Sequence, residues 1–235
     1  MNKIIFFILI VFNINCFSKT IKIAIIDTGF DFNSNWLDYK KENLKSLPVL
    51  CKGFIHKNFS NDKSIQDINS HGTHIAGIIA NQINYNVNYC LVIIKYFGLN
   101  QNNQYNMNKA ILYAIQQKVD IINISAGGTY IDKQEQFLIE LAINRNIVVI
   151  AASGNEHMLM EDKKSCKYYP GCYNKVMNVG NLGNKTSNYG KMVKIVIDGN
   201  NIKSLLPNNK YGYMSGTSQS TAIQTGNIVN KLWRK

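Results

Sequence analysis

The sequence has few prolines, few charged residues and no long apolar segment. It contains three prolines in 235 residues, and 17% of its residues are charged against 46% that are apolar. This balance is typical of a packed globular protein and argues against a disordered tail. The longest apolar run, residues 4–12, is too short to span a bilayer as a helix. No internal repeat or low-complexity stretch divides the chain, so we predict one large domain.

Acidic residues are scarce as well, with 14 Asp and Glu against 26 Lys and Arg, which gives a formal charge of +12. The basic residues are dispersed without a basic arm, and no nucleic-acid-binding motif accompanies them. We therefore expect no nucleic-acid partner. A dispersed positive surface attracts anionic partners only weakly.

Residues 1–18 differ in composition from the rest of the chain. Lys3 precedes the apolar run, and the small residues Cys16 and Ser18 follow it. This pattern predicts a signal peptide that is cut after Ser18, a secreted or periplasmic location and no stable membrane insertion. Two alternatives stay open: a lipoprotein cut before Cys16, which the bulky Asn15 disfavours, and a buried first strand.

Four cysteines lie beyond that segment: Cys51, Cys90, Cys166 and Cys172. An even number in an exported protein predicts two disulfides, for which three pairings are possible. We favour Cys166 with Cys172, which closes a short loop, and then Cys51 with Cys90. Free buried thiols are the alternative, and the spacing is too wide for a typical metal site.

Apolar residues alternate along the chain between the spacing of strands and that of helices. Residues 21–26 form a nearly continuous β-branched run that ends at Asp27, as a buried parallel strand does. Further strands are predicted at residues 90–95, 119–125, 147–152, 175–179 and 191–197. Helices are predicted from His71, over residues 107–118, from an Asp132 cap with Glu135 through Asn144, and from Thr217 toward Trp233.

This order of elements predicts an α/β fold of three layers, in which a mostly parallel sheet carries helices on both faces. In the third predicted helix, Phe137, Leu138 and Leu141 are expected to face the sheet. The active site of such a fold lies beyond the carboxyl ends of its strands.

Four polar residues at predicted strand ends and helix starts together suit acyl transfer. A serine hydroxyl is a weak nucleophile until a base takes its proton, and His71 can do so for Ser218. A buried carboxylate, Asp27, fixes the imidazole tautomer and stabilises its transient positive charge. Asn155 can donate a side-chain N–H to the oxyanion, together with the backbone N–H of Ser218 at the start of the last helix.

The segments AIIDTG, HGTHIAG, AASGN and GTSQSTA, in this order, resemble the four signatures of the subtilisin-like serine proteases, the subtilase family. The resemblance covers nearly the whole chain after residue 18. It implies a serine endopeptidase that acts on polypeptides, with Asp27, His71 and Ser218 as catalytic residues and Asn155 at the oxyanion. On this basis residues 19–235 are predicted to form a subtilase-like peptidase domain.

The resemblance also implies where a peptide binds. The implied substrate-binding residues are Ser125, Ala126, Gly127, Ala152, Ser153 and Gly154. Leu99 is expected to flank the peptide on its other side. Tyr168 stands where the family often has a small pocket residue and is expected to shorten the pocket, while Glu156 is expected to attract a basic side chain. We expect cleavage after small or medium apolar residues.

Three departures from the family are visible. The first predicted strand follows residue 18 directly, so no prodomain is expected, and folding unaided or with a helper or inhibitor acting in trans is predicted. The chain ends soon after Ser218, so the fold is expected to be short at its C-terminus. Thr221 stands where the family usually has proline. We expect a monomer without an organic cofactor or an assignable metal site; calcium is suggested by the resemblance alone.

The same motifs allow other interpretations. A catalytically silent, peptide-binding protein of the subtilase fold is the main alternative, motivated by the same three departures. The Asp27-Thr28-Gly29 motif also suits pepsin-like aspartic proteases, but the alternation of helices and strands argues against an all-β chain. His71 and His74 lack the third ligand of a zinc site.

Overall fold

The computed structural model describes residues 19–35, 45–53, 55–98 and 103–234. The predicted signal peptide at residues 1–18 and the predicted peptide-flanking Leu99 lie outside these ranges. Within the described ranges, no helix is long and apolar enough to cross a membrane.

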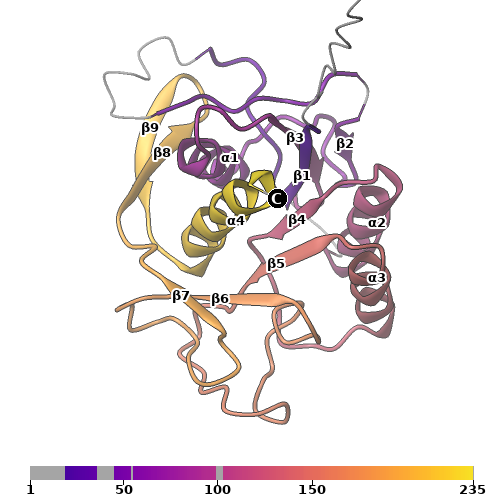
Figure 1. Cartoon of the computed structure of the whole chain (residues 1–235), viewed down its shortest axis with the longest axis vertical. Coiled ribbons are helices and arrows are strands. Elements are labelled where there is room, and N and C mark those ends of the chain that lie inside the picture. Colours follow the sequence, from indigo (N-terminus) through magenta and orange to yellow (C-terminus); the bar gives the residue numbers. More distant parts are fainter. Residues whose placement is uncertain (1–18, 36–44, 54, 99–102, 235) are drawn as a thin grey trace, which may run out of the picture.

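Seven strands, all paired in parallel, form the central sheet (Figure 1). Their order across the sheet is β2-β3-β1-β4-β5-β6-β7. Their bounds are β1 Ile21–Asp27, β2 Lys57–Asn58, β3 Tyr89–Lys95, β4 Ile121–Ile124, β5 Val148–Ala152, β6 Met177–Asn181 and β7 Ile195–Ile197. Because β1, β4 and β5 are neighbours and parallel, their carboxyl ends meet at one edge of the sheet.

Helices cover both faces of this sheet, as predicted. Helices α1 (His71–Gln82) and α4 (Thr217–Trp233) lie on one face, and α2 (Asn103–Gln116) and α3 (Lys133–Asn144) lie on the other (Figure 1). The α/β fold with three layers is therefore confirmed. Strand β1 shows why its sequence is almost continuously apolar: Ile23 and Ile25 pack in the core on the α1 side, and Ala24 and Ile26 pack in the core on the α2 side.

One prediction about the core-facing residues of α3 is wrong. Phe137 is 62% exposed, whereas Leu138 is buried and Leu141 is half-buried. Consecutive helical residues are about 100° apart, so a helix that turns Leu138 to the sheet turns Phe137 toward solvent. The predicted cap is confirmed, because the Asp132 carboxylate accepts a hydrogen bond from the backbone N–H of Glu135 at 2.8 Å.

A two-stranded antiparallel sheet that was not predicted from the sequence packs on α1. It consists of β8 (Ile202–Leu206) and β9 (Lys210–Met214). The turn between them contains Asn208 and Asn209, both in the left-handed region, and asparagine is the residue that tolerates it best after glycine. The Pro-Asn-Asn sequence was therefore a usable signal for this hairpin.

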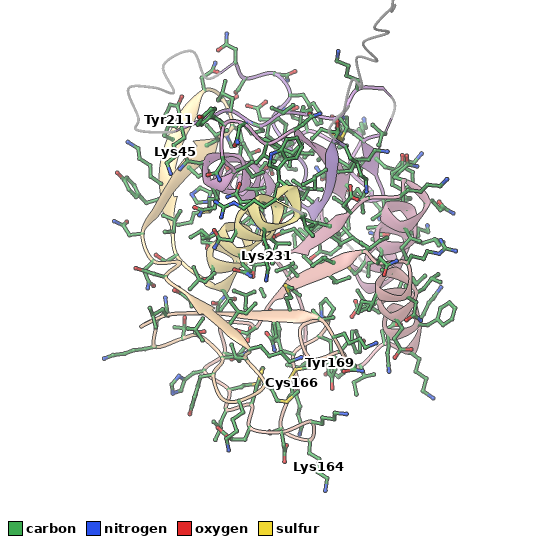
Figure 2. All side chains as sticks on the ribbon, viewed as in Figure 1. Lys45, Lys164, Cys166, Tyr169, Tyr211 and Lys231 are labelled. Carbon is green, nitrogen blue, oxygen red and sulfur yellow. A yellow bond between two sulfur atoms is a disulfide. The ribbon has the colours of Figure 1, made fainter. Side chains whose placement is uncertain are left out.

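Both favoured disulfides are present, Cys51–Cys90 and Cys166–Cys172. The basic side chains are spread over the molecule, as Lys45, Lys164 and Lys231 illustrate by projecting from separate regions (Figure 2).

Candidate active site

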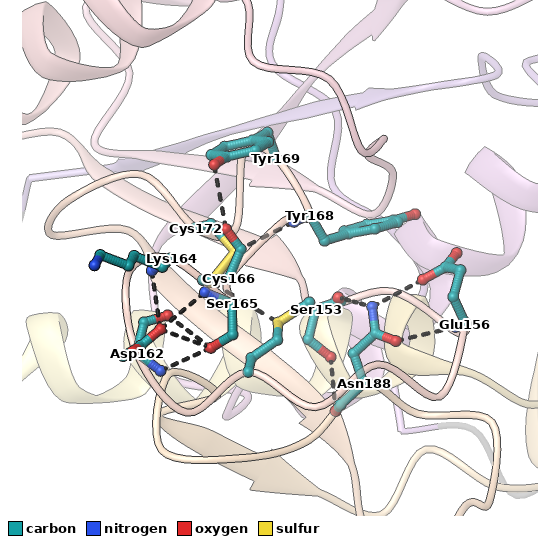
Figure 3. Close-up of a disulfide and its surroundings, with 11 residues drawn as sticks. Ser153, Glu156, Asp162, Lys164, Ser165, Cys166, Tyr168, Tyr169, Cys172 and Asn188 are labelled. Carbon is teal, nitrogen blue, oxygen red and sulfur yellow. Dashed lines mark hydrogen bonds between the residues drawn. A yellow bond between two sulfur atoms is a disulfide. The ribbon is translucent and has the colours of Figure 1, made fainter.

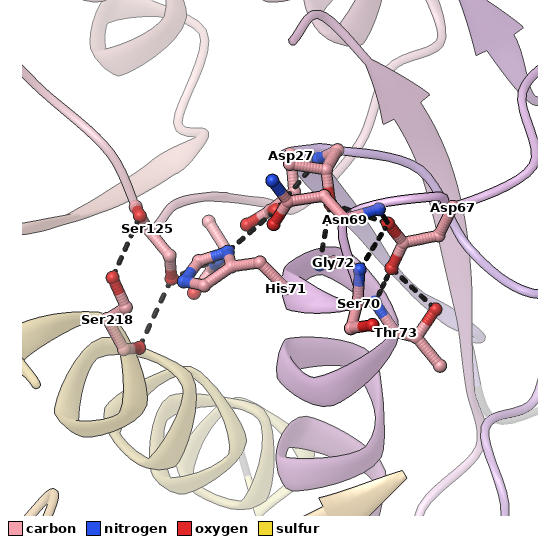
Figure 4. Close-up of polar contacts among 11 residues, drawn as sticks. Asp27, Asp67, Asn69, Ser70, His71, Gly72, Thr73, Ser125 and Ser218 are labelled. Atoms are coloured by element: carbon pink, nitrogen blue, oxygen red, sulfur yellow. Dashed lines mark hydrogen bonds and ion pairs between the residues drawn. The ribbon is translucent and has the colours of Figure 1, made fainter. Parts of the chain in front are cut away.

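Asp27 and His71 are joined by a direct hydrogen bond. Asp27 is the last residue of β1 and is 3% exposed, and His71 is the first residue of α1. Nδ1 of His71 lies 2.8 Å from Oδ1 of Asp27 (Figure 4). A carboxylate can only accept, so this contact places the proton on Nδ1 and leaves the Nε2 lone pair free.

The environment raises the pKa of His71 above its ordinary value. Burial lowers the pKa, since it disfavours the charged imidazole. The negative charge of Asp27, its hydrogen bond and the charge of Asp67 together outweigh that effect. The imidazolium that a proton transfer would create is therefore stabilised.

Gly72 allows α1 to approach the turn after β1. A Cβ on Gly72 would lie 2.2 Å from the carbonyl oxygen of Gly29, which is well inside contact distance. Gly72 itself lies within the helix. Close backbone contact is therefore the reason for a glycine at this position.

Asp67, which was not predicted from the sequence, is a buried acid that organises the start of α1. Its carboxylate is 2% exposed. One oxygen accepts from the Thr28 hydroxyl at 2.9 Å and from the backbone N–H groups of Asn69 and Ser70 at 3.0 and 2.9 Å. The other accepts from the backbone and hydroxyl of Thr73 at 2.8 and 2.7 Å (Figure 4).

These bonds connect the two halves of the site. The Thr28 hydroxyl that donates to Asp67 also accepts from the backbone N–H of Gly72 at 2.9 Å. Thr28 follows Asp27 and Gly72 follows His71, so one carboxylate holds both backbones in place. An acid a few residues before a helix start is the sequence signal that marks such a position.

Ser218 lies in the first turn of α4, on the same side of the sheet as α1. Its hydroxyl donates to the carbonyl oxygen of Ser125 at 2.9 Å (Figure 4). A hydroxyl has one proton, so the expected hydrogen bond from Ser218 to His71 is not formed in this arrangement. The Ser125 hydroxyl in turn donates to the Ser218 carbonyl at 3.2 Å, which ties the end of β4 to the start of α4.

Asn155 lies just beyond β5 and faces the start of α4. Its Oδ1 accepts a hydrogen bond from the backbone N–H of Thr217 at 3.0 Å. This bond orients the carboxamide, because only its oxygen can accept, and leaves the Nδ2 group available as a donor.

The predicted substrate-binding residues lie on two neighbouring segments at the same edge of the sheet as Asp27. The first segment follows β4 and consists of Ser125, Ala126 and Gly127. The second begins with the last residue of β5 and consists of Ala152, Ser153 and Gly154. Asn188 supports the second segment by donating from its Nδ2 to the carbonyl oxygen of Ser153 at 2.6 Å.

Two other predicted features have structural explanations. The Nε2 atom of His74 contacts the carbonyl oxygen of Gly212 at 3.2 Å, so this buried histidine links α1 to β9. The Thr221 hydroxyl donates to the carbonyl of Thr217 at 2.7 Å, within α4. Among the described residues, no group of three or more His, Cys, Asp and Glu side chains could hold a metal ion.

Comparison with known proteins adds the family. Residues 18–230 match the model of the subtilase family. The chain belongs to this family. Members of the family are serine proteases, and this subtilase is classed with them as a serine-type endopeptidase that acts on polypeptides.

Two relatives have similar sequences. The major intracellular serine protease of Bacillus subtilis (strain 168) is 34% identical over 224 residues, which are 90% of this chain and 68% of the relative. The intracellular serine protease of Paenibacillus polymyxa is 34% identical over 223 residues, which are 90% of this chain and 66% of the relative. This subtilase therefore spans about two thirds of the length of each.

A solved structure confirms the fold. The crystal structure of a cold adapted subtilisin-like serine proteinase superposes with a TM-score of 0.74 at 23% sequence identity, covering 92% of this chain and 76% of the other.

The names of the sequence relatives correct the predicted location of the protein. A secreted or periplasmic location is wrong, because both relatives are intracellular proteases.

Proposed function

We propose that this subtilase cuts peptide bonds through an acyl-enzyme, with Ser218 as nucleophile and His71 as general base. Oγ of Ser218 forms a bond to the scissile carbonyl carbon while its proton passes to Nε2 of His71. The C–N bond then breaks, and the imidazolium gives that proton to the leaving amine. Water attacks the acyl-enzyme by the same route and releases the acid and free Ser218.

The hydrogen bond between His71 and Asp27 carries this proposal. At 2.8 Å it keeps the proton on Nδ1, so that Nε2 can receive the serine proton, and Asp27 balances the resulting charge. The Ser218 hydroxyl must turn about its Cα–Cβ bond from the Ser125 carbonyl toward the imidazole. Hydrogen bonds of this kind often tighten only when substrate is bound.

Asn155 is the proposed oxyanion donor. Its Nδ2 is free to donate because the Thr217 N–H engages its oxygen. The backbone N–H of Ser218, at the positive end of α4, is the second donor. Peptide substrate is proposed to lie along Ser125, Ala126, Gly127, Ala152, Ser153 and Gly154.

The proposed reaction needs no organic cofactor, and residues 19–235 are proposed as one peptidase domain, which the family match over residues 18–230 supports. A monomeric state, a helper or inhibitor in trans and a calcium ion stay predictions. A silent peptide-binding protein of the same fold is the competing function. The hydrogen bond from Ser218 to Ser125 instead of His71 favours it.

Intact-mass labelling with a fluorophosphonate distinguishes the two. We expect one adduct, mapped to Ser218 and lost in Ser218→Ala and His71→Ala. Ser215→Ala, which changes an exposed serine just before α4 whose hydroxyl accepts from the Asn201 N–H, should keep the adduct and serves as the matched control. A folded wild-type protein without an adduct would favour the silent binder.

A further inference from the structure

A tyrosine ring occupies the gap between the two substrate-binding segments. A Cβ on Gly127 would lie 2.4 Å from Cε1 of Tyr168, and a Cβ on Gly154 would lie 2.8 Å from Cδ2 of the same ring. Cε1 and Cδ2 belong to opposite edges of the ring. The ring of Tyr168 therefore spans the distance from the segment after β4 to the segment after β5.

The backbone around Tyr168 is held on both sides. The Cys166–Cys172 disulfide closes the loop, the Tyr168 N–H lies 3.3 Å from Sγ of Cys172, and the Cys172 N–H donates to the Tyr168 carbonyl at 2.9 Å (Figure 3). The next residue, Tyr169, exchanges two backbone hydrogen bonds with Gly128, of 2.9 and 2.7 Å. These contacts limit how far the loop can carry the ring away from the gap.

The outer end of the gap is also filled. The Tyr168 side chain points from the disulfide toward Glu156 (Figure 3). Nδ2 of Asn188 donates to the Glu156 carboxylate at 2.8 Å, and Oδ1 of Asn188 accepts from the Glu156 N–H at 3.1 Å. Burial, with the nearby charge of Glu156, raises the pKa of Tyr168 to about 12, so the ring stays neutral. The ring that fills the gap is thus uncharged, and the Glu156 carboxylate beside it is engaged by Asn188.

The gap lies beside the reacting atoms. Oγ of Ser218 is 2.9 Å from the Ser125 carbonyl oxygen, on the first segment, and Asn155 directly follows Gly154, on the second. A carbonyl attacked by Ser218 with its oxygen near Asn155 belongs to a residue placed over this gap. In the proposed reaction, the side chain of that residue, the one before the cut, points into this gap.

We propose that Tyr168 determines substrate specificity by filling this gap, so that the protein cleaves after Gly, Ala or Ser and excludes large side chains before the cut. The inference rests on the proposed function of Ser218. It narrows the expectation of small or medium apolar residues to the smallest ones, and it excludes the basic side chain that Glu156 was expected to attract.

Internally quenched peptides that differ only in Ala or Phe before the cut test this inference. Wild-type kcat/KM should favour Ala by at least about 100-fold, since even one methylene in a tight pocket is worth about 10–200-fold. Tyr168→Ala should raise kcat/KM for the Phe peptide by about 100-fold relative to kcat/KM for the Ala peptide. Tyr168→Phe keeps the ring and should keep the wild-type preference, which makes it the matched control.

Fluorophosphonate titration of every sample separates the two hypotheses. Labelled wild-type protein that cuts after Phe as fast as after Ala overturns the inference and leaves the proposed function standing. A labelled Tyr168→Ala protein that keeps the wild-type preference for Ala over Phe also overturns the inference and leaves the proposed function standing. A folded wild-type protein that forms no adduct overturns the proposed function and the inference with it. Should Tyr168→Ala fail to unfold cooperatively on heating, Tyr168→Leu replaces it, with an intermediate preference expected.

Discussion

Asp67 acts on the proposed site through its neighbours. It contacts the turn after Asp27 through Thr28, and it contacts the first turn of α1 through Ser70 and Thr73. Since His71 begins that turn, Asp67 is a positioning residue for the Asp27–His71 hydrogen bond. Its charge also contributes to the raised pKa of His71, which makes its influence measurable apart from folding.

We predict that Asp67→Asn shifts the acid limb of the kcat/KM profile to lower pH. In the wild type the raised pKa keeps His71 protonated to a pH above 6.5, so activity should appear above that value. Removing the charge of Asp67 lowers the pKa and frees the base at lower pH. Displacement of His71 should also reduce kcat/KM by about 10–100-fold. Glu140→Gln, an exposed change on α3, is the control, and an unshifted limb in Asp67→Asn would indicate a purely structural role.

The disulfides act on loops that connect elements. Cys51–Cys90 joins residues 39 apart, and Cys166–Cys172 joins residues 6 apart. In the chain-entropy account, a cross-link that closes a longer loop removes more freedom from the unfolded chain. The two bonds are therefore expected to contribute unequally to the free energy of unfolding.

We predict that the free energy of unfolding falls by about 4 kcal/mol in Cys51→Ala/Cys90→Ala and by about 2 kcal/mol in Cys166→Ala/Cys172→Ala. Urea unfolding of each double variant, without reductant, measures this. The second variant should also relax the preference against Phe before the cut, because its disulfide closes the loop that carries Tyr168. Equal losses in the two variants would contradict the loop-length argument.

Stability of the whole molecule depends on the buried His74. Burial lowers the pKa of His74 from 6.5 to about 4, although its hydrogen bond to the Gly212 carbonyl opposes the shift. Between these two pH values the unfolded chain binds a proton that the folded protein does not. The free energy of unfolding therefore falls as the pH drops through this window.

We predict that the titration of His74 lowers the free energy of unfolding by about 1.4 kcal/mol for each unit that the pH falls between pH 6.5 and about 4. The total loss over this range is about 3 kcal/mol. Urea unfolding of wild type and His74→Gln across this range isolates the effect, since other titrating groups contribute to both proteins. The difference between the two curves should shrink as the pH falls. A constant difference would mean that His74 titrates alike in both states.

Most of the fold was predictable from local patterns. The β-branched run before Asp27 and the 3.6-residue spacing after His71 each define an element without reference to the rest of the chain. The alternation of such elements then restricts the topology to a parallel sheet with helices on both faces. The missed β8–β9 pair contains few alternating apolar residues and is recognisable chiefly by its turn at Asn208 and Asn209.

The sequence by itself determined the order of the four motifs and therefore the family, because each motif is a short segment with its own spacing. Only the tertiary structure decided that Asp67 holds both sides of the Asp27–His71 pair. It also decided that the Ser218 hydroxyl donates to the Ser125 carbonyl. The position of Tyr168 across the gap between Gly127 and Gly154 is likewise a property of the packed structure. These contacts join segments far apart in the chain. Their geometry follows from how the layers pack, which no local spacing encodes.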